Sequence, residues 1–259
     1  MNQRWLQHRD YYRRPEEPII TSHYEVEAIV TDAPAKAFVC EHHYSRSFPA
    51  ARFRYGLYRA DRMVGVAVFS QPINNKVLSV LPGDPLESVD LGRFVLLDEV
   101  PGNGETWFLA RCFDFLRREG LIGVTSSSDP HPRRTAAGAE IMPGHVGTIY
   151  QAHNAIYLGR STPRTLRILP DGRVFSDRAI QKIRRFEQGW RYSSQILVRF
   201  GATELHPDLD PRVWLAEWLP RLTHKVRHRG NHRYVWAIDR RVRKHLPAGV
   251  AYPKQIDSN

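Results

Sequence analysis

The apolar residues of this chain recur with two different periods, which predict strands and helices in turn. Strands are predicted at residues 23–30, 53–59, 63–69, 92–100 and 121–125, and the Ala60-Asp61-Arg62 turn predicts a hairpin between the second and third. One helix is expected to run from Asp32 toward Tyr44. Another follows the Pro101-Gly102-Asn103-Gly104 turn and ends at Gly120.

The second half of the chain is predicted to be richer in helix. A short helix is expected from Thr148 to Gly159, a hairpin over 164–175, a basic helix up to Arg185, a helix opened by Asp210-Pro211, a strand over 234–238 and a basic helix over 240–245. We therefore expect an N-terminal arm with little structure of its own (1–20), a catalytic core (21–176) and a basic, mostly helical extension packed on the core (177–259).

The composition is that of an ordinary globular protein. With 259 residues, of which 42% are hydrophobic, the chain has room for one large domain or a domain with an added module. It contains no apolar run long enough for a membrane span and no signal-peptide core, so we expect a protein of the cytoplasm. Its two cysteines exclude a disulfide framework and a zinc finger, and Cys112 is expected to be buried.

The positive charge is concentrated in one part of the chain. Residues 1–159 carry a balance of −1, whereas residues 160–259 carry +12. Such an excess, mostly arginine, predicts a polyanionic partner such as nucleic acid, although a basic surface without such a partner is the alternative. The candidate DNA contacts are Arg46, Arg160, Arg164, Lys182, Arg184, Arg185, Arg227, Arg229, Asn231 and Arg233.

Candidate catalytic residues cluster after the strand that ends near Thr125. Ligands of open α/β sheets bind at such strand ends. Asp129 is the candidate proton acceptor and Ser128 could orient an amine, although an aspartate in this position also caps turns. Tyr150, Asn154 and Tyr157 are expected on one face of the following helix, either as proton donors or as packing residues.

The sequence also contains a loose set of nitrogen and oxygen donors that would suit iron. These candidate metal ligands are His43, Tyr44, Asp129 and His145, and the first two are catalytic candidates as well. The alternative for His43 and Tyr44 is ordinary helix C-terminal chemistry, because a histidine there interacts favourably with the helix dipole.

The order of predicted elements resembles the GNAT acyltransferase fold. This resemblance implies an α/β fold with a mixed, mostly antiparallel central sheet flanked by helices. It also implies that Gly102, Asn103 and Gly104 hold the pyrophosphate of an acyl-CoA-type donor, and that Tyr157 corresponds to the tyrosine that protonates the departing thiolate. Asp98 and Glu99 precede the turn, and because their carboxylates would repel a pyrophosphate, we expect any coenzyme A binding to be weak.

Several motifs between residues 40 and 240 resemble the Mom family of bacteriophage DNA-modification proteins, which are themselves GNAT-like. The motifs are His43-Tyr44-Ser45-Arg46, Pro101-Gly102-Asn103, Ser128-Asp129-Pro130, Gly144-His145-Val146-Gly147, Tyr150-Gln151-Ala152 with Asn154, Gly159-Arg160-Ser161 and Gly230-Asn231-His232-Arg233-Tyr234. The resemblance implies conversion of adenine N6 in double-stranded DNA to a methylcarbamoyl (acetamido-type) group, which shields phage DNA from host restriction. It also implies a bound iron ion.

Two other functions fit parts of the same sequence. An ordinary GNAT N-acetyltransferase acting on an amine or a protein would bind acetyl-CoA and would leave the basic half without a role. A non-enzymatic DNA-binding protein would leave the cluster of Ser128, Asp129 and Tyr150 without one. For the adenine-modifying enzyme, the substrate base has to be flipped out of the duplex.

Overall fold

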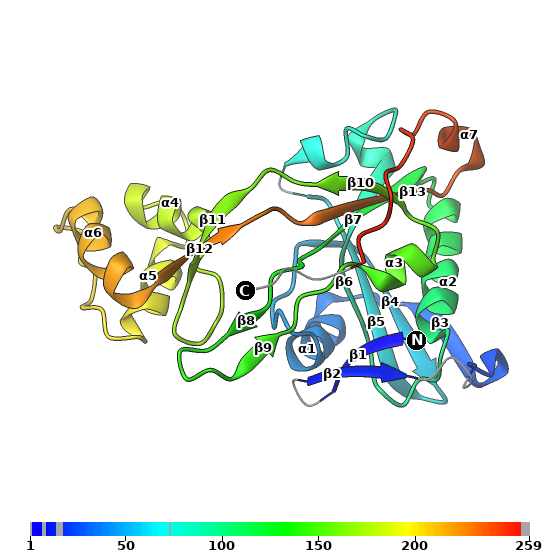
Figure 1. The fold of residues 1–259 in the computed structure, drawn as a ribbon, viewed down its shortest axis with the longest axis horizontal. Coiled ribbons are helices and arrows are strands. Elements are labelled where there is room, and N and C mark those ends of the chain that lie inside the picture. Colours follow the sequence, from blue (N-terminus) through cyan, green and yellow to red (C-terminus); the bar gives the residue numbers. More distant parts are fainter. Residues whose placement is uncertain (1, 7–8, 14–17, 73, 255–259) are drawn as a thin grey trace. The chain divides into compact units, whose positions relative to one another are not determined.

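The computed structural model, shown as a ribbon in Figure 1, describes residues 2–6, 9–13, 18–72 and 74–254. The chain forms two compact units. Unit 1 comprises Met1–His131, Pro143–Ser161 and Asn231–Asn259, and unit 2 comprises Pro132–Met142 and Thr162–Gly230. Among the described residues, no helix is long and apolar enough to cross a membrane.

Unit 1 is built around a seven-stranded sheet in the order β10-β13-β7-β6-β5-β4-β3 (Figure 1). Every neighbouring pair is antiparallel except β6 and β7, which confirms the mixed, mostly antiparallel sheet. The strands are β3 (Tyr24–Ala28), β4 (Ala51–Arg59), β5 (Arg62–Ser70), β6 (Ser88–Leu96), β7 (Gly123–Ser128), β10 (Ile156–Arg160) and β13 (His232–Ala237).

Helices flank this sheet, and the alternation along β5 shows why both of its faces are covered. Successive strand residues point to opposite faces. Val66 and Val68 pack in the cluster of α1 (Asp32–His42), whereas Ala67 and Phe69 belong to the cluster of α2 (Gly104–Arg118), and all four are fully buried. Two further helices of unit 1 are α3 (Thr148–Ala152) and α7 (Arg240–Arg243).

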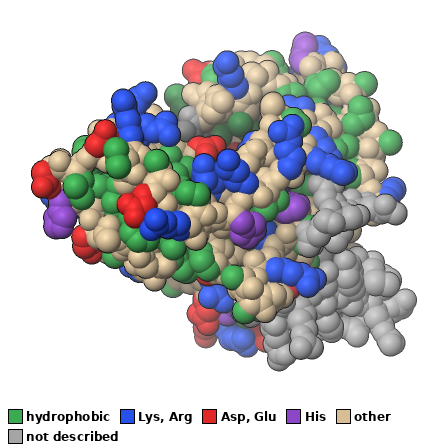
Figure 2. Space-filling view, turned by 60° about the vertical axis from the view of Figure 1, so that its left-hand side comes forward, with side chains coloured by type: hydrophobic (Ala, Val, Ile, Leu, Met, Phe, Trp, Pro, Cys, Tyr) green, Lys and Arg blue, Asp and Glu red, His purple; other side chains and the backbone are tan. Residues whose placement is uncertain are grey.

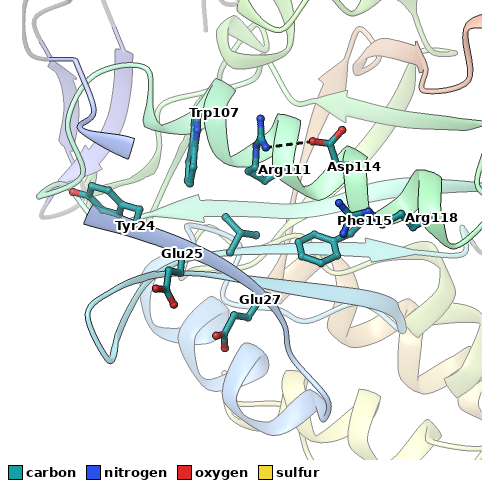
Figure 3. A pocket seen from close by; sticks show the side chains of 9 residues that line it. Tyr24, Glu25, Glu27, Trp107, Arg111, Asp114, Phe115 and Arg118 are labelled. Atoms are coloured by element: carbon teal, nitrogen blue, oxygen red, sulfur yellow. Dashed lines mark ion pairs between the residues drawn. The ribbon is translucent and has the colours of Figure 1, made fainter. Parts of the chain in front are cut away.

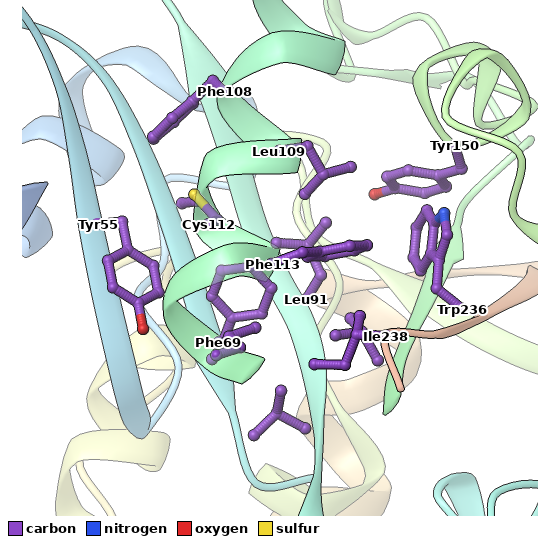
Figure 4. Packing of buried hydrophobic residues seen from close by; sticks show 14 of the residues in the cluster. Tyr55, Phe69, Leu91, Phe108, Leu109, Cys112, Phe113, Tyr150, Trp236 and Ile238 are labelled. Atoms are coloured by element: carbon purple, nitrogen blue, oxygen red, sulfur yellow. The ribbon is translucent and has the colours of Figure 1, made fainter. Parts of the chain in front are cut away.

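The main core lies between α2 and the sheet (Figure 4). Helical spacing places Phe108, Leu109, Cys112, Phe113 and Leu116 on one face of α2, and all five are buried. Each large apolar side chain buried in this way contributes about 1.5–3 kcal/mol. The expected burial of Cys112 is confirmed, and that burial raises the pKa of its thiol well above the usual value.

The sheet divides between β6 and β7. These parallel strands pair only from Ser88 to Asp90 on β6 and from Gly123 to Thr125 on β7. Beyond this point β6 pairs only with β5, and β7 pairs only with β13. The strand ends that follow the division are therefore not joined by a backbone ladder, and side chains can enter there.

Unit 2 has its own apolar core. It contains β8 (Arg133–Arg134), β9 (Glu140–Met142), β11 (Arg164–Ile168), α4 (Asp177–Arg185), α5 (Trp190–Val198), α6 (Pro211–Leu222) and β12 (His224–His228). The three helices bury a cluster that includes Ile183, Leu197 and Trp214. The indole of Trp214 donates to the carbonyl of Thr203 at 3.1 Å, so its polar atom is satisfied.

Several elements differ from the sequence-based expectation. The helix that begins at Thr148 ends at Ala152, and β10 follows from Ile156. The turn between them is made by Asn154, whose φ of 58° is left-handed. A short apolar run does not distinguish the period of a helix from that of a buried strand, which is why Tyr157 was assigned to the wrong element.

Two of the expected boundaries also differ. Residues 2–6 and 9–13 form an antiparallel pair of strands, β1 (Asn2–Leu6) and β2 (Arg9–Arg13), rather than an unstructured arm; residues 1, 7–8 and 14–17 of that expectation lie outside the described residues. The extension expected from residue 177 is not one unit, because β13 is an inner strand of the sheet of unit 1. In the expected 164–175 hairpin, β11 pairs mainly with β12, and one bridge joins Ile168 to Val174.

Candidate active site at the divided sheet

Where the backbone ladder between β6 and β7 ends, side-chain hydroxyl groups make the hydrogen bonds between the two strands. The Thr125 hydroxyl donates to the Asp90 carboxylate at 2.8 Å, and the Ser126 hydroxyl donates to the carbonyl of Leu91 at 3.0 Å. Burial raises the pKa of Asp90 to about 6, while the Thr125 hydrogen bond and the charge of Arg93 act in the opposite direction. The division is therefore lined by a carboxyl group that can titrate and by hydroxyl groups that donate hydrogen bonds.

Tyr150 on α3 reaches this division, since its hydroxyl interacts with the Ser126 side chain. Its ring packs against Trp236 and Tyr234, with centroids 5.5 and 5.3 Å away, at the edge of the core drawn in Figure 4. Burial raises the pKa of Tyr150 far above the usual value. The phenol therefore remains a hydrogen-bond donor at neutral pH.

The loop before α3 is fixed from several sides. Gly147 has a φ of 74°, and a Cβ there would lie 2.8 Å from the rings of Tyr150 and Tyr234, so only glycine fits without displacement. The Tyr234 hydroxyl donates to the carbonyl of Val146, and the Gln151 amide donates to the same carbonyl at 2.9 Å. These contacts hold His145, the preceding residue, in one place.

His145 meets the end of α1. Its Nε2 atom lies 3.3 Å from the hydroxyl of Tyr44, and the neighbouring His43 binds Ser45 through Nδ1 at 2.8 Å. Burial lowers the pKa of His145 to about 4 and that of His43 to about 3. Both imidazoles are therefore neutral at pH 7.

Arg93 supplies the positive charge of this site and was not identified from the sequence. Its guanidinium donates to the carbonyl and the hydroxyl of Ser47, each at 2.7 Å. Tyr44, Tyr150 and Asp90 lie near enough to raise its pKa, whereas burial lowers it. The available signal was a single cation inside the apolar strand Leu91–Leu96, because a buried charge requires partners.

Asp129 lies beside this cluster. Its carboxylate accepts the N–H of His131 at 3.0 Å, its carbonyl accepts the N–H of His145 at 2.9 Å, and its charge raises the pKa of that imidazole against the effect of burial. Asp129 therefore caps a turn, as in the structural interpretation, and at the same time positions His145. Ser128 is fully buried beside Tyr234; burial raises the pKa of Tyr234 to about 12, and the Ser128 hydroxyl acts in the opposite direction.

Tyr157 lies on a strand and not on the expected helix. It lies on β10, where its hydroxyl is 2.6 Å from Nδ1 of the buried His232 and its ring centroid is 5.2 Å from that of Tyr234, with the two rings tilted by 36°. His232 also lowers the pKa of His145, which connects this pair electrostatically to the loop. Asn154 is exposed at the turn after α3, apart from the cluster.

The expected iron site is not supported. Within the described ranges, no group of three or more histidine, cysteine, aspartate or glutamate side chains could hold a metal ion. Of the expected ligands, His43 uses Nδ1 for Ser45, and Tyr44 and His145 face each other. These donors are thus engaged with other groups of the protein and do not converge on one point. The set therefore does not fit a metal, and no step of the chemistry below involves a metal ion.

The candidate cofactor turn precedes α2. Gly102 is buried, and its carbonyl accepts the N–H of Ile19 at 2.8 Å, while the N–H of Gly104 donates to the carbonyl of Pro101 at 3.3 Å. Asn103, exposed and with a φ of 64°, is the residue before the helix. The Gly104 N–H, one of the donors that a pyrophosphate would need, thus already has a partner within the protein.

The candidate DNA contacts are distributed over both units. In unit 1, Arg46 and Arg233 are exposed, Arg160 and Asn231 are half-buried, and the Arg233 guanidinium donates to the carbonyl of Leu158 at 2.9 Å. In unit 2, Arg164, Arg184, Arg185, Arg227 and Arg229 are exposed and Lys182 is half-buried. Figure 2 shows lysine and arginine side chains in small groups, interspersed with acidic and apolar ones.

A pocket between β3 and α2 contains none of the residues predicted from the sequence. Its lining mixes charges of both signs, and Arg111 faces Asp114 at 3.6 Å (Figure 3). It is lined by Tyr24, Glu25, Val26, Glu27, Trp107, Arg111, Asp114, Phe115 and Arg118. This mixture does not select a ligand.

Comparisons with known proteins place the chain in a family. No curated protein sequence matches it. An acetyltransferase from Bacillus subtilis solved with CoA is similar in structure at 9% identity and a TM-score of 0.33, over 83% of this chain and 97% of that chain. An N-acetyltransferase from Staphylococcus aureus Mu50 is similar at 7% identity and a TM-score of 0.35, over 83% and 99%. Likenesses this distant carry no argument about function. The Mom protein family, by contrast, matches residues 23–254, nearly the whole chain, and the chain therefore belongs to the Mom protein family.

Proposed function

We propose that this protein is a transferase that converts N6 of adenine in double-stranded DNA to a methylcarbamoyl (acetamido-type) group. The observation that carries the proposal is the meeting of Tyr44, His145 and Tyr150 at the divided sheet of a Mom family member. In the cytoplasm of a bacterial host, such a modification would protect phage DNA from restriction.

The chemistry requires a proton acceptor and an oxyanion donor, because N6 is a poor nucleophile. As the bond from N6 to the donor's carbonyl carbon forms, N6 gives up a proton. We assign that proton to His145, directly or through the hydroxyl of Tyr44, because this imidazole is neutral and the carboxylate of Asp129 stabilises its charged form.

The remaining groups serve the other half of the reaction. Tyr150, which stays protonated, donates a hydrogen bond to the developing oxyanion. The bond from the carbonyl carbon to the leaving group then breaks, and the leaving group receives the proton held by His145. Arg93 supplies positive charge near both tyrosines, and we propose an acyl-CoA-type molecule as the donor.

Nucleoside mass spectrometry of plasmid DNA from cells that express the protein tests this function. We expect a deoxyadenosine whose mass is raised by the transferred group. DNA that stays unmodified, together with acetylation of a small amine by the purified protein, would replace this proposal by ordinary acetyl transfer. DNA binding with neither reaction would indicate a protein that only binds DNA.

A further inference from the structure

The two-stranded ribbon β11–β12 of unit 2 has two different faces. Cross-strand partners share a face, and successive pairs alternate between faces. One face contains the buried residues Leu166, Ile168 and His228. The other contains the pairs Thr165–Arg227 and Arg167–Lys225. Here Thr165, Lys225 and Arg227 are exposed and Arg167 is half-buried, so this second face, which we call the basic ribbon face, presents three cations and a hydroxyl.

Unlike several arginines of the same unit, these cations have no carboxylate partner among the described residues. Arg173 is paired with Asp171 at 2.6 Å, Arg178 with Glu187 at 2.6 Å and Arg221 with Glu217 at 3.0 Å. No ion pair within the described part of the chain involves Arg167, Lys225 or Arg227. Their charges are therefore available to an anion from outside.

The rest of unit 2 has the same sign of charge. The unit contains 16 lysines and arginines and 8 aspartates and glutamates, a net charge of +8 of the +11 of the whole chain. The chain enters this unit after β10 and returns to β13, and the two ends are joined by hydrogen bonds between Ser161 and Asn231 at 2.8 and 2.9 Å. The larger segment of unit 2, Thr162–Gly230, is thus an insertion between two neighbouring strands of the sheet.

We propose that the basic ribbon face binds the phosphate backbone of double-stranded DNA and holds the substrate. The inference rests on the proposed function, since it supplies the binding that adenine modification requires. Charge complementarity carries it: three unpaired cations on neighbouring strand positions, together with the Thr165 hydroxyl, are the groups that contact phosphates. Such contacts position the duplex and do not read its sequence.

The test is the salt dependence of binding to a fluorescent duplex. The variant Arg167→Gln/Lys225→Gln/Arg227→Gln should lower the slope of log affinity against log salt by about 2 to 3, because each lost phosphate contact removes about 0.9. The matched control Arg173→Gln/Arg178→Gln/Arg221→Gln removes the same charge from ion-paired positions of unit 2, and its slope should stay near that of the wild-type protein. A thermal melt of each protein shows that unit 2 remains folded.

A second variant separates charge from geometry. Arg167→Lys/Arg227→Lys keeps the charges but loses the planar fork that recognises guanine. It should retain the wild-type slope on all duplexes. An equal loss of slope in the ribbon variant and the control would overturn the proposal that the basic ribbon face binds DNA. It would leave the proposal of adenine modification unaffected. A wild-type protein that neither binds nor modifies DNA would overturn both proposals.

Discussion

The hydroxyl of Tyr44 lies 3.3 Å from Nε2 of His145, although 101 residues separate them in the chain. Burial lowers the pKa of this imidazole to about 4, so the ring is neutral at pH 7. A phenol beside a neutral imidazole forms a short path along which a proton can move. This relationship makes the divided sheet a candidate for proton-transfer chemistry.

The two buried histidines predict a loss of stability in acid. Their ordinary pKa is 6.5, but in the folded protein the pKa is about 3 for His43 and about 4 for His145. Below pH 6.5 the unfolded chain therefore takes up protons that the folded protein does not, and the folded state loses stability as the pH is lowered. Each histidine should cost up to about 2 kcal/mol between pH 7 and pH 5.

The variant His145→Gln should reduce this acid effect. Thermal melts at pH 7 and pH 5 should show a smaller fall in Tm for His145→Gln than for the wild-type protein, whereas replacing the exposed His224 by Gln should leave the fall unchanged. The raised pKa of Asp90, about 6, acts in the opposite sense between pH 6 and pH 4, but one carboxylate does not offset two histidines. A Tm difference that is the same in all three proteins would contradict the assignment.

The backbone conformation of the loop before α3 predicts a large effect of Gly147→Ala on stability. An added methyl group there meets two tyrosine rings at 2.8 Å in a left-handed backbone. Gly159→Ala is the matched control, because Gly159 has a φ of 77° but nothing within 4 Å of the position of its missing Cβ. The control should cost about 1–2 kcal/mol of backbone strain, and Gly147→Ala about 1–3 kcal/mol more. Urea unfolding measures both, and equal costs would show that the tyrosines move aside easily.

Local sequence patterns predicted most elements of this fold. The β4–β5 hairpin, α1 and α2 follow from period, turn residues and caps. The place of β13 could not be predicted, because its partners β7 and β10 are chosen by long-range pairing and the chain runs through all of unit 2 before reaching it.

The same distinction applies to the site. Tyr44, Asp129, His145 and Tyr150 could be named as candidates because polar residues at a strand end or around a glycine loop are conspicuous in the sequence. Arg93 was missed because a lone arginine in a strand carries no motif, and only the fold shows that it contacts Ser47 and lies near Tyr44 and Tyr150. The iron site was expected from residue types alone. Metal ligation also requires the donor atoms to point toward one position, whereas His43 binds Ser45 and Tyr44 faces His145.

Substitutions of Asp129 should separate its two roles, which are to cap the turn and to place a negative charge near His145. Asp129→Asn keeps an oxygen for the N–H of His131, so the Tm should stay close to that of the wild-type protein. It loses the charge that favours protonated His145, so modification of DNA should fall by about a hundredfold or more. Asp129→Ala loses both and should also lower stability by about 1 kcal/mol. Normal modification by Asp129→Asn would limit this residue to capping the turn.

Coenzyme A binding is predicted to be weak. The N–H of Gly104 already has a partner within the protein, and Glu99 adds negative charge nearby even though it is paired with Arg62 at 3.0 Å. Calorimetry should give a Kd for acetyl-CoA weaker than about 10 μM. Tighter binding would contradict this expectation and would show that the turn opens to accept a pyrophosphate.

The most direct test of the site compares two tyrosine hydroxyls. Tyr150→Phe removes the hydroxyl at the divided sheet, while Tyr252→Phe removes one that donates to the carbonyl of Ala155 at 2.7 Å outside the proposed site. Both proteins should melt within a few degrees of the wild-type protein. Nucleoside mass spectrometry of DNA from expressing cells should show modified deoxyadenosine reduced by about a hundredfold or more for Tyr150→Phe and near the wild-type amount for Tyr252→Phe. Near-normal modification by a folded Tyr150→Phe protein would contradict the assignment of the active site.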